Sequence, residues 1–78
     1  MEVEIITPDK NIFKGEAKFV SVPGIDGSLG ILDYHAPLIT TLKTGNILLR
    51  KEDNSEENIE VNGGVLEVLK NKVMILAE

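Results

Sequence analysis

The sequence contains no cysteine, no tryptophan and only one histidine among its 78 residues. Without cysteine, neither a disulfide framework nor a thiolate metal site can form. A single histidine also leaves a metal ion without its usual set of imidazole donors. The aromatic residues are Phe13, Phe19 and Tyr34, which are too scattered to make a platform for stacking bases. We therefore expect no metal ion and no cofactor.

Basic residues are also few. Eight Lys and Arg stand against 13 Asp and Glu, giving a net charge of −5, and no basic cluster offsets this average. A phosphate backbone would be repelled, so we expect no nucleic-acid partner. No apolar run is long enough to span a bilayer as a helix, and the N-terminus lacks the basic and apolar regions of a signal peptide. These absences predict a soluble domain without direct membrane insertion.

What is present is typical of one small globular domain over residues 1–78, with 42% hydrophobic and 27% charged residues. Short segments of alternating apolar and polar residues are separated by turn residues roughly every 8 to 12 positions, and no helical periodicity is sustained. The sequence therefore predicts an all-β fold. Within it, Asn62–Gly64 has the composition of a hairpin turn, and Thr44–Asn46 is a second predicted break.

One stretch, Pro23–Gly45, holds four of the seven glycines, the only histidine and two of the three prolines. Its glycines at 24, 27 and 30 do not follow a phosphate-binding pattern, because no G-x-x-x-x-G-K-[ST] is present and no helix is predicted to follow. We expect them to allow positive φ angles in consecutive tight turns.

The same stretch offers one catalytic hypothesis. Asp33 and His35 would share a face if the chain is extended there, so the carboxylate could orient the ring as a general base. No serine lies in a G-x-S-x-G elbow, and no local nucleophile completes the arrangement. A small hydrolase is therefore the least favoured of the functions considered.

The order of motifs is more specific than any one glycine pattern. "PGIDGSLGILDYHAPLITTLKTGNILL" is followed by "NGGVLEV" and by "NKVMILA", and "VEIITPDKNIFKGEAKFVSVPG" precedes them. This order resembles the N-terminal β-sandwich domain of the epsilon subunit of F-type rotary ATP synthases, and the resemblance covers essentially the whole chain. It implies a flattened sandwich of about ten short strands in two sheets.

The resemblance also implies a role. Epsilon is a non-catalytic part of the central stalk, and its β-domain lies between the gamma subunit and the polar loops of the membrane c-ring. There it couples ion-driven rotation to ATP synthesis. A member of this family would be a peripheral component at the cytoplasmic face of a bacterial inner membrane, or of an equivalent energy-transducing membrane.

Residue by residue, the resemblance implies two interfaces. The c-ring would face Asp26, Gly27, Ser28 and Leu29, and gamma would face His35, Ala36 and Thr40. Other family positions are expected to shape turns or stiffen the chain; these are Gly24, Gly30, Pro37, Gly45, Gly63 and Gly64.

Two departures from the family pattern alter the expectations. The position of Ser28 is often acidic in the family, so here only Asp26 offers a negative charge to the ring. The sequence also stops at Glu78, where family members usually continue into an inhibitory helical hairpin that carries an ATP site in some of them. We therefore expect no nucleotide binding by this chain. A free-standing β-sandwich that binds a different protein partner is the alternative reading.

Overall fold

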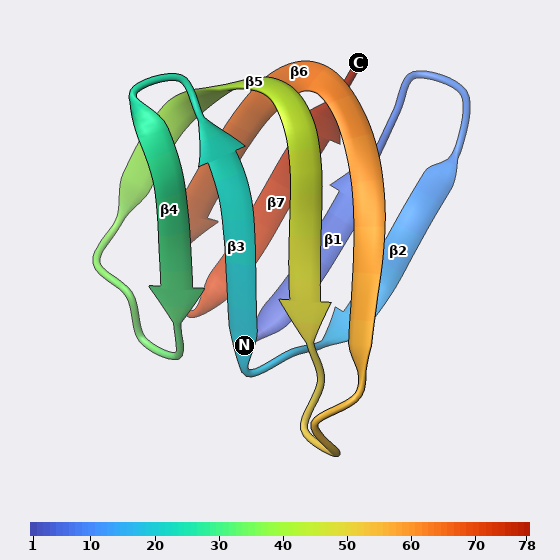
Figure 1. Ribbon diagram of the computed structural model, residues 1–78. Coiled ribbons are helices and arrows are strands. Elements are labelled where there is room, and N and C mark those ends of the chain that lie inside the picture. The colour runs from blue at the N-terminus through green and yellow to red at the C-terminus, as the bar shows by residue number, and fades with distance from the viewer.

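The computed structural model describes residues 1–78 and contains seven β-strands without a helix (Figure 1). The strands are β1 (Glu2–Ile6), β2 (Asn11–Glu16), β3 (Phe19–Gly24), β4 (Gly27–Leu32), β5 (Leu38–Arg50), β6 (Glu56–Leu69) and β7 (Lys72–Ala77). The structure has no helix of the length and apolarity that crossing a bilayer requires. The all-β prediction is confirmed.

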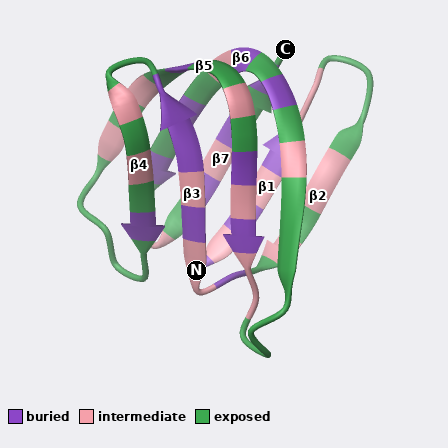
Figure 2. Cartoon of the chain, viewed as in Figure 1, coloured by how far each residue is buried: buried purple, intermediate pink, exposed green.

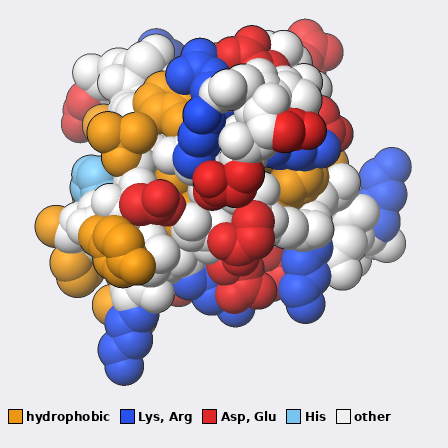
Figure 3. Space-filling model, turned by 90° about the horizontal axis from the view of Figure 1, so that it is seen from below, with side chains coloured by type: hydrophobic (Ala, Val, Ile, Leu, Met, Phe, Trp, Pro, Cys, Tyr) orange, Lys and Arg blue, Asp and Glu red, His pale blue; other side chains and the backbone are white.

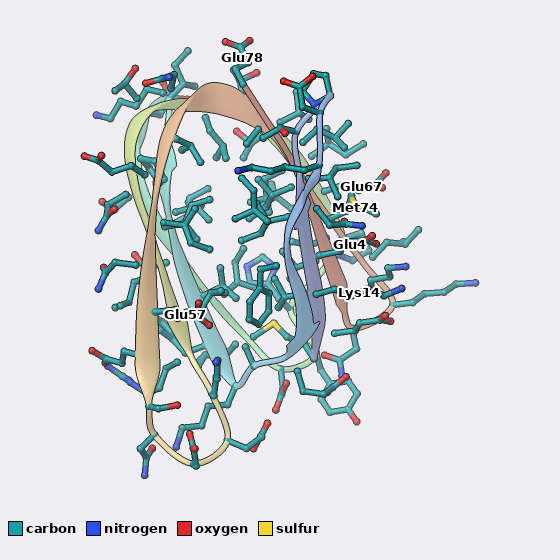
Figure 4. The ribbon with its side chains drawn as sticks, turned by 90° about the vertical axis from the view of Figure 1, so that its right-hand side faces the viewer. Glu4, Lys14, Glu57, Glu67, Met74 and Glu78 are labelled. Carbon is teal, nitrogen blue, oxygen red and sulfur yellow. The ribbon has the colours of Figure 1, made fainter.

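All seven strands belong to one sheet in the order β2-β1-β7-β6-β5-β3-β4. The sheet folds over itself, so that it forms two facing layers (Figures 1 and 4). The first layer holds β2, β1, β7, the end of β6 and the start of β5. The second holds the start of β6, the end of β5, β3 and β4. β1 and β7 pair in parallel, and every other pair is antiparallel.

The fold-over occurs where β5 and β6 bend together. Their pairing keeps one register from Leu38↔Val68 to Arg50↔Glu56 and omits only the pair at Lys43. At this point the buried side chains switch from even-numbered to odd-numbered positions in β5, and from odd-numbered to even-numbered positions in β6. The switch lets the same two-stranded ribbon face the core in both layers.

Two consecutive glycines make the bend in β6 possible. Gly63 and Gly64 have φ angles of 128° and 144°, a region that residues with a Cβ rarely adopt. A Cβ on Gly64 would also fall onto the carbonyl oxygen of Leu76 in β7. Only glycine therefore fits at the point where β6 crosses from one layer to the other.

The core lies between the two layers (Figure 2). Sixteen buried apolar residues form one cluster, to which every strand except β2 contributes, and no polar or charged residue is buried with them. The largest fully buried side chains are Ile5, Ile31, Ile47, Leu49, Leu66 and Ile75. β2 covers the cluster from one side through Ile12 and Phe13, which are half-buried.

Two details of the sequence prediction need correction. The fold has seven strands rather than about ten, because β5 and β6 each run through both layers and the layers are parts of one continuous sheet. The segments Asn62–Gly64 and Thr44–Asn46, predicted as turns, are bends within β6 and β5. The turn that joins these two strands is at residues 51–55, within the polar run Lys51–Asn58 that the sequence predicts as a solvated hairpin tip.

Candidate protein-docking surface

The glycine-rich stretch of the sequence forms one side of the sandwich. β4 ends the second layer there, and the start of β5 ends the first layer behind it, at the left of Figure 1. We call residues 24–42 the β4 flank. It includes the β3–β4 turn, β4, the 33–37 loop and the start of β5, and thus all the residues predicted to meet a partner.

A two-residue turn, Ile25 and Asp26, joins β3 to β4. Both side chains are exposed, Ile25 to 57%. The Ile25 backbone N–H donates a 3.0 Å hydrogen bond to the carbonyl oxygen of Thr41, which ties the turn to the other layer. The turn is thereby fixed in space although its side chains face solvent.

A shallow groove opens between this turn and the start of β5. Residues 24–29 line one side of it, and Leu38 and Thr40 line the other. Thr40 therefore lies beside the residues predicted to face the c-ring, whereas His35 and Ala36 line a separate cleft with Pro37 and the β6–β7 turn. The structure brings the two predicted interfaces into contact at Thr40.

The 33–37 loop is held in place by contacts with distant parts of the chain. The Asp33 carboxylate accepts a 2.6 Å hydrogen bond from the Met1 amine, which also donates to the carbonyl oxygen of Ala17. The next residue, Tyr34, has a φ of 62°, and its backbone N–H donates to the Asn71 side chain at 2.8 Å. Tyr34 is thus held in an unfavourable backbone conformation while its side chain is 83% exposed.

The Met1 amine has an altered acidity in this position. Its burial lowers its pKa, but the hydrogen bond and charge of Asp33, together with the charges of Glu16 and Glu52, more than reverse this effect. The pKa of the amine is consequently raised above its usual value of 8.0.

The Asp33–His35 pair of the hydrolase hypothesis does not form. Asp33 is engaged with Met1, and Nδ1 of His35 lies 2.7 Å from the carbonyl oxygen of Ala36. Since a carbonyl oxygen only accepts, Nδ1 is the protonated nitrogen and donates to Ala36. It therefore does not donate to Asp33, as a histidine base oriented by that carboxylate would. The loop shapes the surface of the protein and does not assemble a nucleophile and a base.

The glycines of the flank serve different purposes from those expected. Of the three predicted to have positive φ angles, only Gly27 has one, at 134°. Gly24 and Gly30 lie at close approaches instead: a Cβ on Gly24 would clash with the Gly27 carbonyl oxygen at 2.6 Å, and one on Gly30 would make a tight contact with the Phe19 ring at 3.1 Å. The prediction of consecutive tight turns with positive φ is therefore wrong for Gly24 and Gly30.

The whole chain, residues 1–78, matches the family described as "ATP synthase, Delta/Epsilon chain, beta-sandwich domain". The chain belongs to this family.

Curated relatives agree with this membership. Over all 78 residues, the chain is 44% identical to the ATP synthase epsilon chain of Delftia acidovorans and 45% identical to those of Bordetella petrii and Moorella thermoacetica. It covers 56%, 55% and 58% of these proteins, respectively. The chain thus spans little more than half the length of the epsilon chains that it matches.

Solved structures show the same fold at lower identity. A chain of the Euglena gracilis mitochondrial ATP synthase (OSCP/F1/c-ring, rotational state 1) superposes with a TM-score of 0.90 at 21% identity, covering 96% of this chain and 48% of that one. A chain of the Tetrahymena thermophila mitochondrial ATP synthase, central stalk and c-ring, gives a TM-score of 0.82 at 21% identity, covering 97% and 61%. At this identity the likeness establishes the β-sandwich fold alone.

Surface composition distinguishes the β4 flank from the rest of this Delta/Epsilon β-sandwich. Seen from below, hydrophobic side chains gather on the side that carries the single histidine, while acidic and basic side chains crowd the middle (Figure 3). Exposed apolar residues on the flank are Ile25, Leu32, Tyr34 and Ile39, the last 71% exposed. Such a concentration is typical of a surface that meets another protein.

Sequence reasoning named none of these four residues as partner contacts, and two of them show why. Ile25 occupies a turn position next to Asp26, and Ile39 alternates with Leu38 and Thr40, which face the groove. The spacing of Gly24 and Gly27 was the available signal for Ile25, because a two-residue turn between them exposes whatever it contains. For Ile39 no local signal exists, since alternation identifies two faces but not which one is covered.

Proposed function

We propose that this chain is the β-sandwich part of a non-catalytic central-stalk subunit of an F-type, proton-translocating ATP synthase. In this role it docks on the gamma subunit and on the polar loops of the c-ring, and it couples ion-driven rotation of the ring to ATP synthesis. The observation that carries the proposal is the match of all 78 residues to ATP synthase epsilon chains at 44–45% identity.

The structure supports this role with a surface suited to binding a protein. The c-ring contacts are assigned to the turn and the start of β4, at Asp26, Gly27, Ser28 and Leu29, where the backbone is fixed and the tip is exposed. The gamma contacts are assigned to the adjoining part of the β4 flank, at His35, Ala36 and Thr40. Because Thr40 lies in the groove beside the turn, the two partners would occupy neighbouring sites.

In the assembled enzyme the subunit would be peripheral, on the cytoplasmic face of a bacterial inner membrane or its equivalent. Its function requires no nucleotide, no metal ion and no chemistry of its own. An exposed ion pair between Asp26 and a basic ring loop contributes about 0–1 kcal/mol, so shape and apolar contact dominate this docking. The negative charge of the chain also favours neutral or basic partner surfaces.

Binding to purified gamma subunit, measured by calorimetry, tests the proposal. We expect a one-to-one complex that Thr40→Arg weakens by at least roughly tenfold, because a long charged side chain would occupy the groove. Thr44→Arg is the matched control, since Thr44 is an exposed threonine of the same strand and lies outside the β4 flank. We expect this control to bind as the unmodified chain does.

Absence of binding by a folded chain would contradict the gamma-docking role and favour a sandwich with another partner. Equal losses in the two threonine variants would contradict the placement of gamma at the groove.

A further inference from the structure

Folding one sheet into two layers leaves two strand edges in each layer. These are β2 and the start of β5 in the first layer, and the start of β6 and β4 in the second; the first three are blocked. An unblocked edge presents free backbone N–H and C=O groups and invites another strand to pair with it. On β2, the edge is interrupted by an irregularity in pairing between Ile5 and Ile6 and carries the exposed charges of Lys14 and Glu16. Figure 4 shows Lys14 directed to solvent on this side.

The edge at the start of β6 is blocked by charge and by a cover. Exposed Glu56, Glu57 and Glu60 lie along it. Lys51 forms a 2.8 Å ion pair with Glu57 and lies 5.7 Å from the centre of the Phe13 ring of β2. These side chains therefore cover the opening between the two layers beside the start of β6. A partner strand would have to displace this cover and desolvate three carboxylates.

The edge at the start of β5 is uncharged between Leu38 and Leu42 but is already in use. The Thr41 carbonyl oxygen, which points away from β6, accepts the hydrogen bond from Ile25. The β3–β4 turn therefore occupies part of this edge.

The β4 edge is protected only at its end, where the backbone N–H of His35 donates a 3.2 Å hydrogen bond to the carbonyl oxygen of Leu32. From Gly27 to Leu32 it contains no charged residue and no proline, and its pairing with β3 runs without a register shift. No strand lies on its other side. β4 is thus a regular, uncharged and exposed edge. It lies on the β4 flank, which contains the residues of this chain predicted to contact a partner.

The register identifies which backbone groups are free. A two-residue turn makes Gly24 and Gly27 a hydrogen-bonded pair, and in antiparallel sheets such pairs alternate with non-bonded ones. Leu29 and Ile31 therefore bond to β3, while the N–H and C=O groups of Ser28 and Gly30 point away from the sheet. Both residues are exposed.

The side chains along this edge leave room for a neighbour. Gly30 has no side chain, and Ser28 has a small one. At the end of the strand, Leu32 is 62% exposed beside Phe19, whose ring lies under the guanidinium of Arg50 at 5.3 Å. A backbone could approach the small residues while one apolar side chain of the incoming segment packs against Leu32.

We propose that β4 pairs through Ser28 and Gly30 with an extended segment of the gamma subunit, which adds a strand to the second layer. This inference rests on the proposed function and deepens it, because it assigns part of the docking to backbone hydrogen bonds. The segment is recognised by its extended backbone and by small or apolar side chains facing Leu32. Gamma is favoured as the occupant because β4 leads directly into His35 and Ala36, which are assigned to gamma. At Ser28, gamma takes the outward backbone groups, and the c-ring contact assigned above is left to the side chain.

Hydrogen exchange of individual amides, measured by NMR on the chain alone and on its complex with purified gamma, tests the inference. In the free chain, we expect the amides of Ser28 and Gly30 to exchange quickly and those of Leu29 and Ile31 to be protected. In the complex, the Ser28 and Gly30 amides should exchange about a hundredfold more slowly, while Leu29 and Ile31 change little. This alternation is specific to edge pairing.

A complex in which Ser28 and Gly30 remain unprotected would overturn the inference and leave the proposed function intact. Equal slowing at all four residues would overturn it as well, because it would report a stiffer hairpin instead of a new strand. Failure of the folded chain to bind gamma would overturn both the inference and the proposed function.

A proline variant gives an independent readout. Ser28→Pro removes one outward N–H, and we expect it to weaken gamma binding roughly tenfold. Lys14→Pro is the matched control, because it removes an outward N–H from the charged edge of β2 and should leave affinity unchanged. Circular dichroism establishes that each variant is folded; if Ser28→Pro is not, the exchange pattern of the unmodified chain decides the matter.

Discussion

Replacing Gly64 with alanine tests how the sandwich is folded over. Gly64 has a φ of 144° and lies where its Cβ would fall onto the Leu76 carbonyl oxygen. Gly27 is the matched control because its φ is 134° while a Cβ there would meet nothing within 4 Å. The two variants share the backbone penalty and differ only in the close approach of β6 to β7.

The expected magnitudes follow from these two contributions. An alanine in this φ region costs about 1–3 kcal/mol, and forcing extra volume against the neighbouring backbone adds about 1–3 kcal/mol. We therefore expect Gly27→Ala to lower the free energy of unfolding by about 2 kcal/mol and Gly64→Ala by about 4 kcal/mol. The latter is a large part of the 4–12 kcal/mol or so expected for a domain of this size.

Urea unfolding followed by far-ultraviolet circular dichroism measures both values, and the melting temperature of Gly64→Ala should fall by roughly 20 °C. Equal destabilisation of the two variants would refute the reasoning, because the contact with Leu76 would then contribute nothing. A Gly64→Ala variant as stable as the unmodified chain would show that the bend does not need glycine at all.

Three further predictions concern the rest of the fold. Because the pKa of the Met1 amine is raised in the folded chain, its contribution to stability is complete below the unfolded pKa of 8.0 and is lost as the pH rises through the folded value. The free energy of unfolding should thus fall as the pH rises above 8.0; in Asp33→Asn this fall should largely disappear, and its persistence would contradict the assigned contact. Leu49→Ala, at a fully buried site, should cost about 2–5 kcal/mol, whereas Leu76→Ala, at a half-exposed site, should cost under about 1 kcal/mol; similar losses in urea titrations would contradict the assigned core. Raising salt from about 0.05 to 1 M should change stability by less than roughly 1 kcal/mol, since most ion pairs are exposed; a larger fall would indicate an ion pair on which folding depends.

Alternation and spacing were sufficient to predict the all-β class, because a strand buries every second residue whatever its neighbours are. They were not sufficient to distinguish every reversal of direction from a bend within a strand. Asn62–Gly64 has the composition of a hairpin turn, yet β6 continues through it. Whether such a segment turns or bends depends on whether a neighbouring strand bends beside it, and β5 does so at Lys43.

The candidate site was predictable in part for the same reason. The glycine pattern located the β4 flank, and the family resemblance named its residues. The contact between Asp33 and the Met1 amine joins residues 32 positions apart, so no local pattern could indicate it. The position of Thr40 beside Asp26 likewise depends on the Ile25–Thr41 hydrogen bond, which ties one layer to the other.

The passage of β5 and β6 through both layers has a mechanical consequence. In a sandwich of two separate sheets, only side-chain packing resists sliding of one sheet over the other. Here the layers are joined by two covalent chains that are hydrogen-bonded to each other up to and beyond the bend. Shear between the layers must deform those chains, so the domain should behave as a stiff block, which suits a part that we propose to turn under load.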